Sequence, residues 1–426
     1  MVLDSGVKIL NISSYDHGGA GIASVVFNDY LLANGCFSRL LVRDTDYKNK
    51  EVIHYKKKYF PYIAYRIRKK RYSILSRRWR HLKRDNKFKD IIVFDDQNSV
   101  ASAKSILRQA GFRPDIIFIH WTHNFITPEM LFELKRLTDA KIVSVMMDNA
   151  VITGGCHYPF GCQGYVTGCN DCPLFGIKTD FPALILKKKE ALYPKDMEFW
   201  ATTSDCGRVE KSILGRERRA YPILFPINEN VLPTASKQEI RDSYNITADR
   251  KLVMIGCTTF NIMDNRKGYD YLISMLILMG ERFSDIKKRV TLVLVGDNDE
   301  GILGKMGYDV LRFGYVPVDK LMELYKMSDL FLSTSIEDSG PLMVNQSIAV
   351  GTPVAAFNIG VAQDLIVDNE TGFTADLYDF DALAIKIGEY LSSDNGQNMG
   401  ENCIAMFRKK SEEISPLIQL QRILNS

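Results

Sequence analysis

The stretch from Ser333 to Gly372, STSIEDSGPLMVNQSIAVGTPVAAFNIGVAQDLIVDNETG, indicates a strand end, a turn, a helix and a second strand. Ser339 suits the N-cap of the helix, Pro341 its first turn, and Gly351 its end. Backbone amides near Ser339 and Gly340, together with the positive end of the helix dipole, suit an anion such as a phosphate. The stretch therefore predicts a phosphate-binding turn at the edge of a sheet.

Acidic side chains flank this helix on two loops. Glu337 and Asp338 come just before it, and Asp364 follows the short apolar strand Val354–Phe357. Ionised carboxylates only accept hydrogen bonds, so these three suit the hydroxyls of a sugar or a ribose.

This pattern resembles the donor-nucleotide region of retaining glycosyltransferases of family 4, whose helix reads like EAMACGTPVVA. The matching positions are Glu337, Asp338, Pro341, Gly351, Thr352, Pro353, Gly360 and Asp364. The family's second glutamate falls on Gln346, whose amide only partly imitates a carboxylate as a partner for ribose hydroxyls. The resemblance implies an α/β protein of the GT-B fold, with two Rossmann-like domains facing across a cleft.

The length of 426 residues and the order of motifs predict two domains. Short β-branched runs alternate with helical patterns, as in doubly wound parallel sheets. Strand candidates are 8–12, 38–42, 91–94, 115–120 and 141–146, then 252–256, 290–295, 310–313, 330–333 and 354–357. The predicted organisation is an acceptor domain at 1–220, a proline-rich linker at 221–233, a donor domain at 234–410, and a C-terminal helix at 411–426 that crosses back to the first domain.

One segment holds all the excess positive charge. Residues 56–89 contain 15 Lys or Arg and one acidic residue, leaving 40 basic and 50 acidic residues elsewhere. Interleaved aromatic and aliphatic side chains favour an anchor at an anionic membrane surface. A solvated helical insertion is an alternative. Nucleic-acid binding is a third, because charge alone does not separate phosphodiester from lipid headgroup; we expect no nucleic-acid partner.

The location predicted from the sequence is cytoplasmic, peripheral at the inner face of the plasma membrane. No apolar run approaches the 18 residues of a membrane span, and the start MVLDSGVKILNISS lacks the order of a signal peptide. The 8 cysteines in so long a chain do not suggest a secreted disulfide scaffold.

A glycine-rich loop, DHGGAGIA at 16–23, follows the first predicted strand. Gly18, Gly19 and Gly21 let backbone amides approach a ligand, but Ser24 replaces the third glycine of a dinucleotide fingerprint. The family resemblance implies that the loop closes over the donor phosphates and the acceptor substrate. A plain tight turn is the alternative.

Two adjacent cations, Arg266 and Lys267, stand just before a helix that opens at Gly268. They suit a diphosphate whose charge grows as a glycosidic bond breaks. The alternative is that they are cations at the start of a helix that are exposed to solvent and bind no ligand. The resemblance assigns them to the pyrophosphate and assigns Glu337 to the donor sugar.

The resemblance also places a nucleotide base beside the backbone around Tyr315 and Val316, with Gly296 at a strand end as a further donor-binding residue. Asp297 and Asp299 form a DxD triplet, but this fold normally needs no metal for the donor, so we expect no catalytic cofactor.

The segment 153–173 carries cysteines at 156, 162, 169 and 172, and its closing CxxC has the spacing of two thiolates on one zinc ion. Cys156, Cys162, Cys169 and Cys172 are therefore predicted ligands of a structural zinc, with His157 as a spare ligand. Buried free thiols and a redox pair are the alternatives.

The motif resembles a family 4 subgroup with TGGCHY…C…CGNCP, in which His-Asp usually precedes it. Here Met147 stands before Asp148. Asp148 is then a candidate catalytic side chain. Thr153, His120 and His123 are candidate contacts to the acceptor substrate, and each histidine is equally compatible with a structural role.

Together these features predict a hexosyltransferase-type enzyme that moves a sugar from a nucleoside diphosphate to a hydroxyl with retention. UDP is the default nucleotide and GDP the alternative. The expected acceptor substrate is a glycan or lipid-linked glycan in cell-surface polysaccharide assembly. A nonenzymatic binding protein on the same fold is the competing hypothesis, because of Met147 and Gln346.

The basic segment predicts binding to anionic vesicles that weakens as salt rises. Deleting residues 56–89 should abolish this binding, as measured by vesicle sedimentation with uncharged vesicles as the control. Equal partitioning of the deletion variant and the intact chain would rule out the anchor.

Overall fold

The computed structural model describes residues 6–45, 52–56, 95–175, 179–257, 265–296, 302–340, 342–393 and 399–425. The chain divides into two compact units, Met1–Pro226 and Ile227–Ser426. The point of division falls within the proline-rich segment 221–233. Most of the basic segment, 57–89, lies outside the described residues, as do the predicted strand 91–94, Asp297, Asp299 and Pro341.

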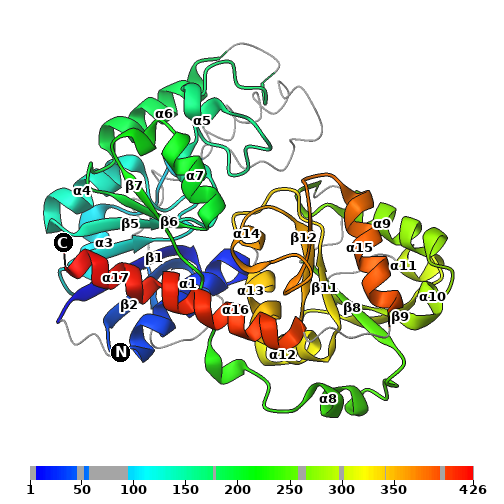
Figure 1. Cartoon of the computed structure of the whole chain (residues 1–426). Coiled ribbons are helices and arrows are strands. Elements are labelled where there is room, and N and C mark those ends of the chain that lie inside the picture. Colours follow the sequence, from blue (N-terminus) through cyan, green and yellow to red (C-terminus); the bar gives the residue numbers. More distant parts are fainter. Residues whose placement is uncertain are drawn as a thin grey trace. The chain divides into compact units, whose positions relative to one another are not determined.

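The first unit is built on a seven-stranded parallel sheet in the order β3-β2-β1-β4-β5-β6-β7 (Figure 1). Its strands are β1 (Lys8–Tyr15), β2 (Phe37–Asp44), β3 (Val52–His54), β4 (Ile116–Ile119), β5 (Lys141–Val145), β6 (Glu198–Ala201) and β7 (Arg219–Pro222). Its helices are α1 (Gly18–Ala33), α3 (Ala103–Ala110), α4 (Pro128–Thr138), α5 (Gly164–Thr167), α6 (Phe181–Leu192) and α7 (Thr203–Lys211).

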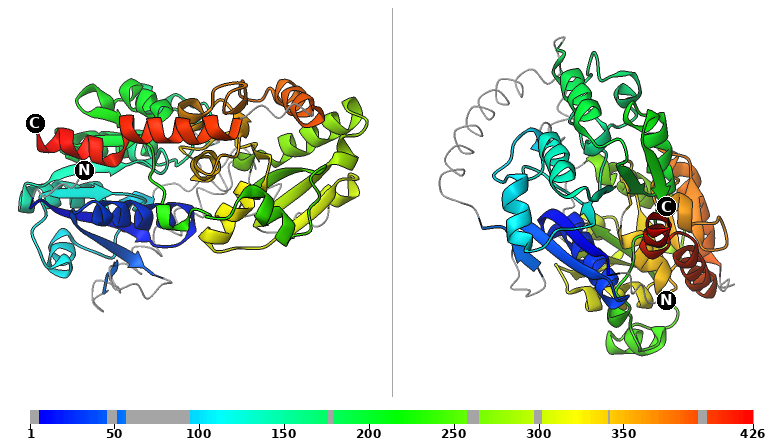
Figure 2. Two further views of the ribbon diagram at one scale, coloured as in Figure 1. Left: turned by 60° about the horizontal axis from the view of Figure 1, so that its bottom comes forward. Right: turned by 90° about the vertical axis from the view of Figure 1, so that its left-hand side faces the viewer.

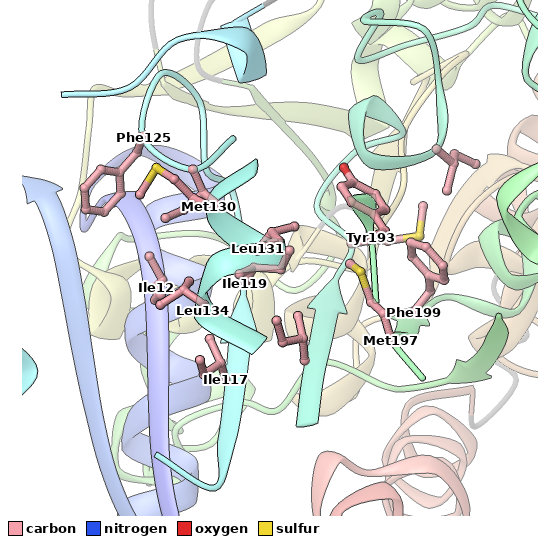
Figure 3. Close-up of a cluster of buried hydrophobic side chains, with 14 of the residues drawn as sticks. Ile12, Ile117, Ile119, Phe125, Met130, Leu131, Leu134, Tyr193, Met197 and Phe199 are labelled. Atoms are coloured by element: carbon pink, nitrogen blue, oxygen red, sulfur yellow. The ribbon is translucent and has the colours of Figure 1, made fainter. Parts of the chain in front are cut away.

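Both faces of this sheet are buried, which is why its strands are apolar runs. In Figure 3 Met130, Leu131 and Leu134 of α4 point toward the sheet. There they meet Ile12 of β1 and Ile119 of β4 in one cluster of fully or almost fully buried side chains.

The other face packs against α1 through aromatic rings. Phe27 of α1 lies edge-on to Phe118 of β4, with ring centroids 5.1 Å apart, and Phe118 lies 4.9 Å from Trp200 of β6. Large aromatic rings therefore fix α1 against the centre of the sheet.

The second unit holds a six-stranded parallel sheet in the order β10-β9-β8-β11-β12-β13. Its strands are β8 (Lys251–Cys257), β9 (Val290–Gly296), β10 (Asp309–Phe313), β11 (Leu330–Ser333), β12 (Val354–Phe357) and β13 (Gly372–Ala375). Its helices are α8 (Lys237–Ser243), α9 (Tyr269–Arg282), α10 (Ile286–Arg289), α11 (Ile302–Lys305), α12 (Val318–Met327), α13 (Leu342–Ala349), α14 (Ala362–Leu365), α15 (Phe380–Ser392), α16 (Met399–Ile414) and α17 (Pro416–Leu424).

The last two helices follow one another closely, as Figure 2 shows. α16 packs against α13 and α14, and α17 begins with Pro416 in its first turn. The crossing of residues 411–426 to the first domain stays a prediction.

The α/β fold with two parallel sheets is confirmed, and each predicted strand within the described residues overlaps an observed strand, with 115–120 and 141–146 extending one residue past β4 and β5. The sequence analysis missed β3, β6, β7 and β13. It placed Tyr221 and Pro222 in the linker, whereas both pair with β6 as the end of β7. A proline fits there because β7 is an edge strand, where a missing N–H breaks no ladder.

In each sheet the order of the strands reverses at one point, called the topological switch point. In the first unit this point lies between β1 and β4, and in the second between β8 and β11. In open parallel sheets ligands bind outside the carboxyl ends of the strands at such switch points. The loops after these four strands are therefore the candidate ligand-binding loops. Among the described residues no helix is both long and apolar enough to cross a membrane.

Candidate functional site

In the second unit the loops after β8 and β11 are tied together by their backbones. The Ile336 N–H donates to the Arg266 carbonyl oxygen at 2.9 Å, and Thr334 Oγ1 donates to the Lys267 carbonyl oxygen at 3.0 Å. Gly268 caps α9 with φ 66°, and a Cβ there would collide with the carbonyl oxygen of Thr334. Only glycine allows this approach, which fixes both cations at the switch point.

Both cations point at one carboxylate. Asp338 Oδ2 lies 3.1 Å from Arg266 Nη1 and 2.7 Å from Lys267 Nζ, while the Gly340 N–H donates to Asp338 Oδ1 at 3.3 Å. Burial alone would raise the pKa of Asp338. The charges of Lys267 and Arg266, with the hydrogen bonds from Lys267 and Gly340, outweigh burial and hold this pKa below its ordinary value.

The protein therefore supplies its own anion at the place where the sequence predicts a phosphate. Two cations and a backbone amide at the start of the α13 segment converge on Asp338. A diphosphate that enters this site has to share these donors with Asp338 or displace it. Asp338 thus sets how much positive charge a ligand meets.

The remaining predicted donor contacts of this region lie close along the chain. Glu337 and Ser339 are buried on either side of Asp338. Gly360, with φ 54°, brings the next loop so close that a Cβ would lie 2.8 Å from the Asp338 carbonyl oxygen. Gln346 on α13 and Asp364 on α14 are half-buried.

The predicted base-binding backbone lies at the carboxyl ends of β9 and β10. Gly296 closes β9 with φ 113°, and its N–H donates to the Gly314 carbonyl oxygen at 3.3 Å. Tyr315 is 74% exposed and Val316 half-buried.

In the first unit the glycine loop joins β1 to α1 as expected. A Cβ on Gly18 or Gly19 would meet nothing within 4 Å, so these two leave open space. Gly21 differs, because a Cβ there would lie 2.9 Å from the Asp16 carbonyl carbon. Gly21 serves helix-to-strand packing, and Gly18 and Gly19 leave room for a ligand.

A histidine pocket lies at the carboxyl ends of β4 and β5 in the same unit. Its lining includes His120, Trp121, His123, Asp148 and His157. The structure therefore brings together Asp148, His120 and His123, which the sequence analysis proposed separately. His157, proposed only as a spare zinc ligand, joins them.

Asp148 holds His157 in place. Asp148 Oδ2 lies 2.6 Å from His157 Nδ1, and the Ala150 N–H donates to Asp148 Oδ1 at 2.8 Å. Burial alone would raise the pKa of Asp148, but the charge of His157 and hydrogen bonds from His157, Ala150 and Trp121 lower it below its ordinary value. Because a carboxylate only accepts, Nδ1 of His157 carries the hydrogen.

Thr153 is not part of this pocket. Its hydroxyl donates to the Cys156 carbonyl oxygen at 2.6 Å and accepts from the Gly155 N–H at 3.2 Å, so it closes its own loop. It lines the neighbouring cysteine pocket instead.

The sequence analysis missed a buried ion pair under these loops. Lys189 of α6 is fully buried, with Nζ 2.5 Å from Asp96 Oδ2 and 2.6 Å and 3.0 Å from the carbonyl oxygens of Ala150 and Thr153. No sequence pattern distinguishes Lys189 as the buried residue, because it is one of three consecutive lysines, Lys187, Lys188 and Lys189. The pair fixes the start of the cysteine loop.

The four predicted zinc ligands line one pocket of about 220 Å³. Burial raises the pKa of Cys156 to about 12 and that of Cys169 to about 11, so the thiols are neutral. Among the described residues, no three His, Cys, Asp or Glu side chains lie close enough together to hold one metal ion. As placed, the thiols do not fit a tetrahedral zinc.

Two parallel-sheet Rossmann-like domains define the GT-B fold, and solved structures confirm it. The fold is similar to that of sucrose-phosphate synthase from Thermosynechococcus elongatus, with TM-score 0.64 over 98% of this chain and 99% of that chain at 16% identity. Anabaena Alr3699/HepE, solved in complex with UDP-glucose, gives 0.59 over 98% of each chain at 14% identity. These likenesses show the fold alone.

The second unit is similar to a catalytic family. Residues 236–409 match the family model described as Glycosyl transferases group 1. The putative colanic acid biosynthesis glycosyl transferase WcaC of Escherichia coli K12 is 20% identical over 278 residues, 62% of this chain and 64% of that protein. The chain spans less than two thirds of the length of the curated relatives that it matches. Residues 236–409 are thus similar to a group 1 glycosyltransferase domain.

Replacing Asp338 by Asn should tighten the binding of inorganic pyrophosphate, because it removes the internal anion that neutralises Arg266 and Lys267. Without ligand the same variant should melt at a lower temperature, since it removes the carboxylate charge that lies beside both cations. Calorimetry and thermal melting measure the two effects, with Asp379→Asn at an exposed helix cap as the control. Weaker pyrophosphate binding would show that Asp338 is not a competitor of the ligand.

The zinc prediction from the sequence requires about one zinc per chain, and elemental analysis tests it. The metal content should fall when Cys169 and Cys172 are both replaced by serine. A stable, metal-free wild-type protein would leave the thiols as the free cysteines that the structure shows, with Cys169 buried and the other three half-buried.

Proposed function

We propose that the protein is a glycosyltransferase that moves a sugar from a nucleoside diphosphate to an acceptor hydroxyl with retention of the anomeric configuration. The observation that supports it most is the convergence of Arg266, Lys267 and the Gly340 amide at the switch point of the group 1 domain. Those groups suit a leaving diphosphate, whose negative charge increases as the glycosidic bond breaks.

The reaction needs no protein nucleophile in this proposal. The acceptor oxygen attacks the sugar carbon from the face that the diphosphate leaves, the bond to the diphosphate breaks, and the hydroxyl proton passes to a diphosphate oxygen. Arg266 and Lys267 stabilise the leaving group, and Glu337 orients the donor sugar. Binding energy that exists only when charge has developed lowers the barrier.

UDP is the nucleotide that we propose, with GDP as the alternative. Anabaena Alr3699/HepE, which shares the fold, was solved with UDP-glucose, and the E. coli relative is named for colanic acid biosynthesis. We therefore propose a glycan or lipid-linked glycan as the acceptor substrate, in polysaccharide assembly. The basic segment 56–89 supports a peripheral place on an anionic membrane.

A thermal-shift panel of UDP, GDP, ADP and their sugars tests the donor class. A nucleotide that binds only the native state raises the melting temperature, and at 100 times its Kd it contributes about 2.7 kcal/mol. Turnover of the selected donor sugar, followed by NMR of the product anomer, tests transfer and retention. Nucleotide binding without hydrolysis or transfer would favour the nonenzymatic alternative, and an inverted product would contradict retention.

Replacing Lys267 by Ala should cost about 2–4 kcal/mol in transition-state stabilisation, measured as a loss in kcat/KM. Lys288→Ala is the matched control, because the Lys288 side chain is 84% exposed. Unchanged kcat/KM for a folded Lys267→Ala protein would remove Lys267 from the mechanism.

A further inference from the structure

The histidine pocket is small and polar. Its volume is about 50 Å³, and its lining includes His120 and His157. A single water molecule needs a cavity of about 10–15 Å³, so the pocket admits a few groups of that size. It suits a hydroxyl or hydroxymethyl arm and excludes a whole sugar ring.

A buried network fixes the hydrogen on His120. Asn11 Nδ2 donates to Ser38 Oγ at 2.8 Å and to Asn28 Oδ1 at 3.2 Å. The amide oxygen of Asn11 is therefore the atom that lies 3.0 Å from His120 Nε2. Because this oxygen only accepts, Nε2 carries the hydrogen and Nδ1 carries a lone pair.

Among the described residues, no group donates a hydrogen bond to His120 Nδ1, a buried acceptor. The residue is only 6% exposed, and burial lowers its pKa to about 3, so the ring stays neutral near pH 7. A buried acceptor that makes no hydrogen bond costs free energy, whereas most such atoms in proteins are satisfied. A hydroxyl donor from a ligand would remove this cost.

A second histidine of the pocket lining, His157, is held in place by a neighbouring carboxylate. His157 is buried and held by its 2.6 Å contact with Asp148. Trp121 and His123, both half-buried in the pocket lining, stack with ring centroids 5.2 Å apart. Fixed polar and aromatic walls are what a specific small-molecule site needs.

We propose that His120 Nδ1 accepts a hydrogen bond from a non-reacting hydroxyl of the acceptor substrate, an inference that rests on the proposed glycosyltransferase function. His120 is thus a specificity-determining residue for the sugar that receives the new bond. A site built to hydrogen-bond a hydroxyl rejects an analogue without it far more strongly than an apolar pocket rejects an extra group.

Two variants of His120 distinguish the effect of losing the acceptor atom from the effect of changing the shape of the side chain. His120→Leu removes the acceptor, whereas His120→Gln keeps a carbonyl acceptor and an amide donor for Asn11. With the donor selected by the nucleotide panel, we expect His120→Leu to lower kcat/KM for the best methyl glycoside about tenfold or more. His120→Gln should lose less, and the Kd for UDP should be unchanged in both. His54→Leu, at an exposed position of β3, is the control.

Methyl glycosides of glucose, galactose and mannose serve as the probes, with their monodeoxy analogues. One monodeoxy analogue should be a poor acceptor for the wild type, and its kcat/KM should not fall further in His120→Leu. Unchanged kcat/KM for the parent glycoside in folded His120→Leu would overturn the proposal. Failure of the wild type to bind any nucleotide would instead contradict the proposed function.

Histidine-detected NMR keeps the proposal testable if His120→Leu does not fold. In the wild type, Nδ1 of His120 should carry no proton at neutral pH, and its signal should shift when the methyl glycosides are added. His54 should not respond. A proton on Nδ1, or no shift with any of the three glycosides, would overturn the proposal.

Discussion

The pairing of Asp338 with Arg266 and Lys267 is the interaction on which the second unit depends. It joins loops more than 70 residues apart in sequence, each at the carboxyl end of a central strand. Two cations at such a site repel each other, and Asp338 offsets that repulsion while the site is empty. The same carboxylate then competes with any anionic ligand. Stability without ligand and affinity for ligand are therefore opposed at one residue.

The sequence predicted the parts of this site but not their pairing. Arg266, Lys267 and Asp338 each lie in a loop that follows a predicted strand, and the carboxyl ends of parallel strands meet at one edge of the sheet. Which of the neighbouring carboxylates turns toward the cations depends on the loop conformation. That conformation depends on Gly268 and on backbone bonds from Thr334 and Ile336, which no local pattern reveals. The resemblance assigns Glu337 to the sugar, and the contacts place Asp338 beside the two cations.

The first unit shows a different limit of sequence reasoning. The cysteine spacing predicts a zinc site, and the structure shows that the four cysteines line one pocket. Spacing does not determine the direction of each side chain, and as placed the thiols do not form a metal site. His157 belongs by sequence to the cysteine motif but by contact to Asp148. The position of His157 next to Cys156 in the sequence gives no sign of its tertiary contact with Asp148.

The two units handle charge in opposite ways, and this difference matches the two halves of a transfer reaction. In the second unit, cations meet a carboxylate that is itself a candidate ligand contact, so positive charge becomes available when Asp338 moves. In the first unit, Lys189 is buried against Asp96 and two carbonyl oxygens, so it has no charge to offer a ligand. The histidine pocket instead presents a neutral ring, because the low pKa of His120 keeps it uncharged. A polyanion gains little from such a pocket, whereas a neutral hydroxyl gains a hydrogen bond without displacing a charge. The function that we propose accordingly assigns the diphosphate to the second unit and an uncharged sugar to the first.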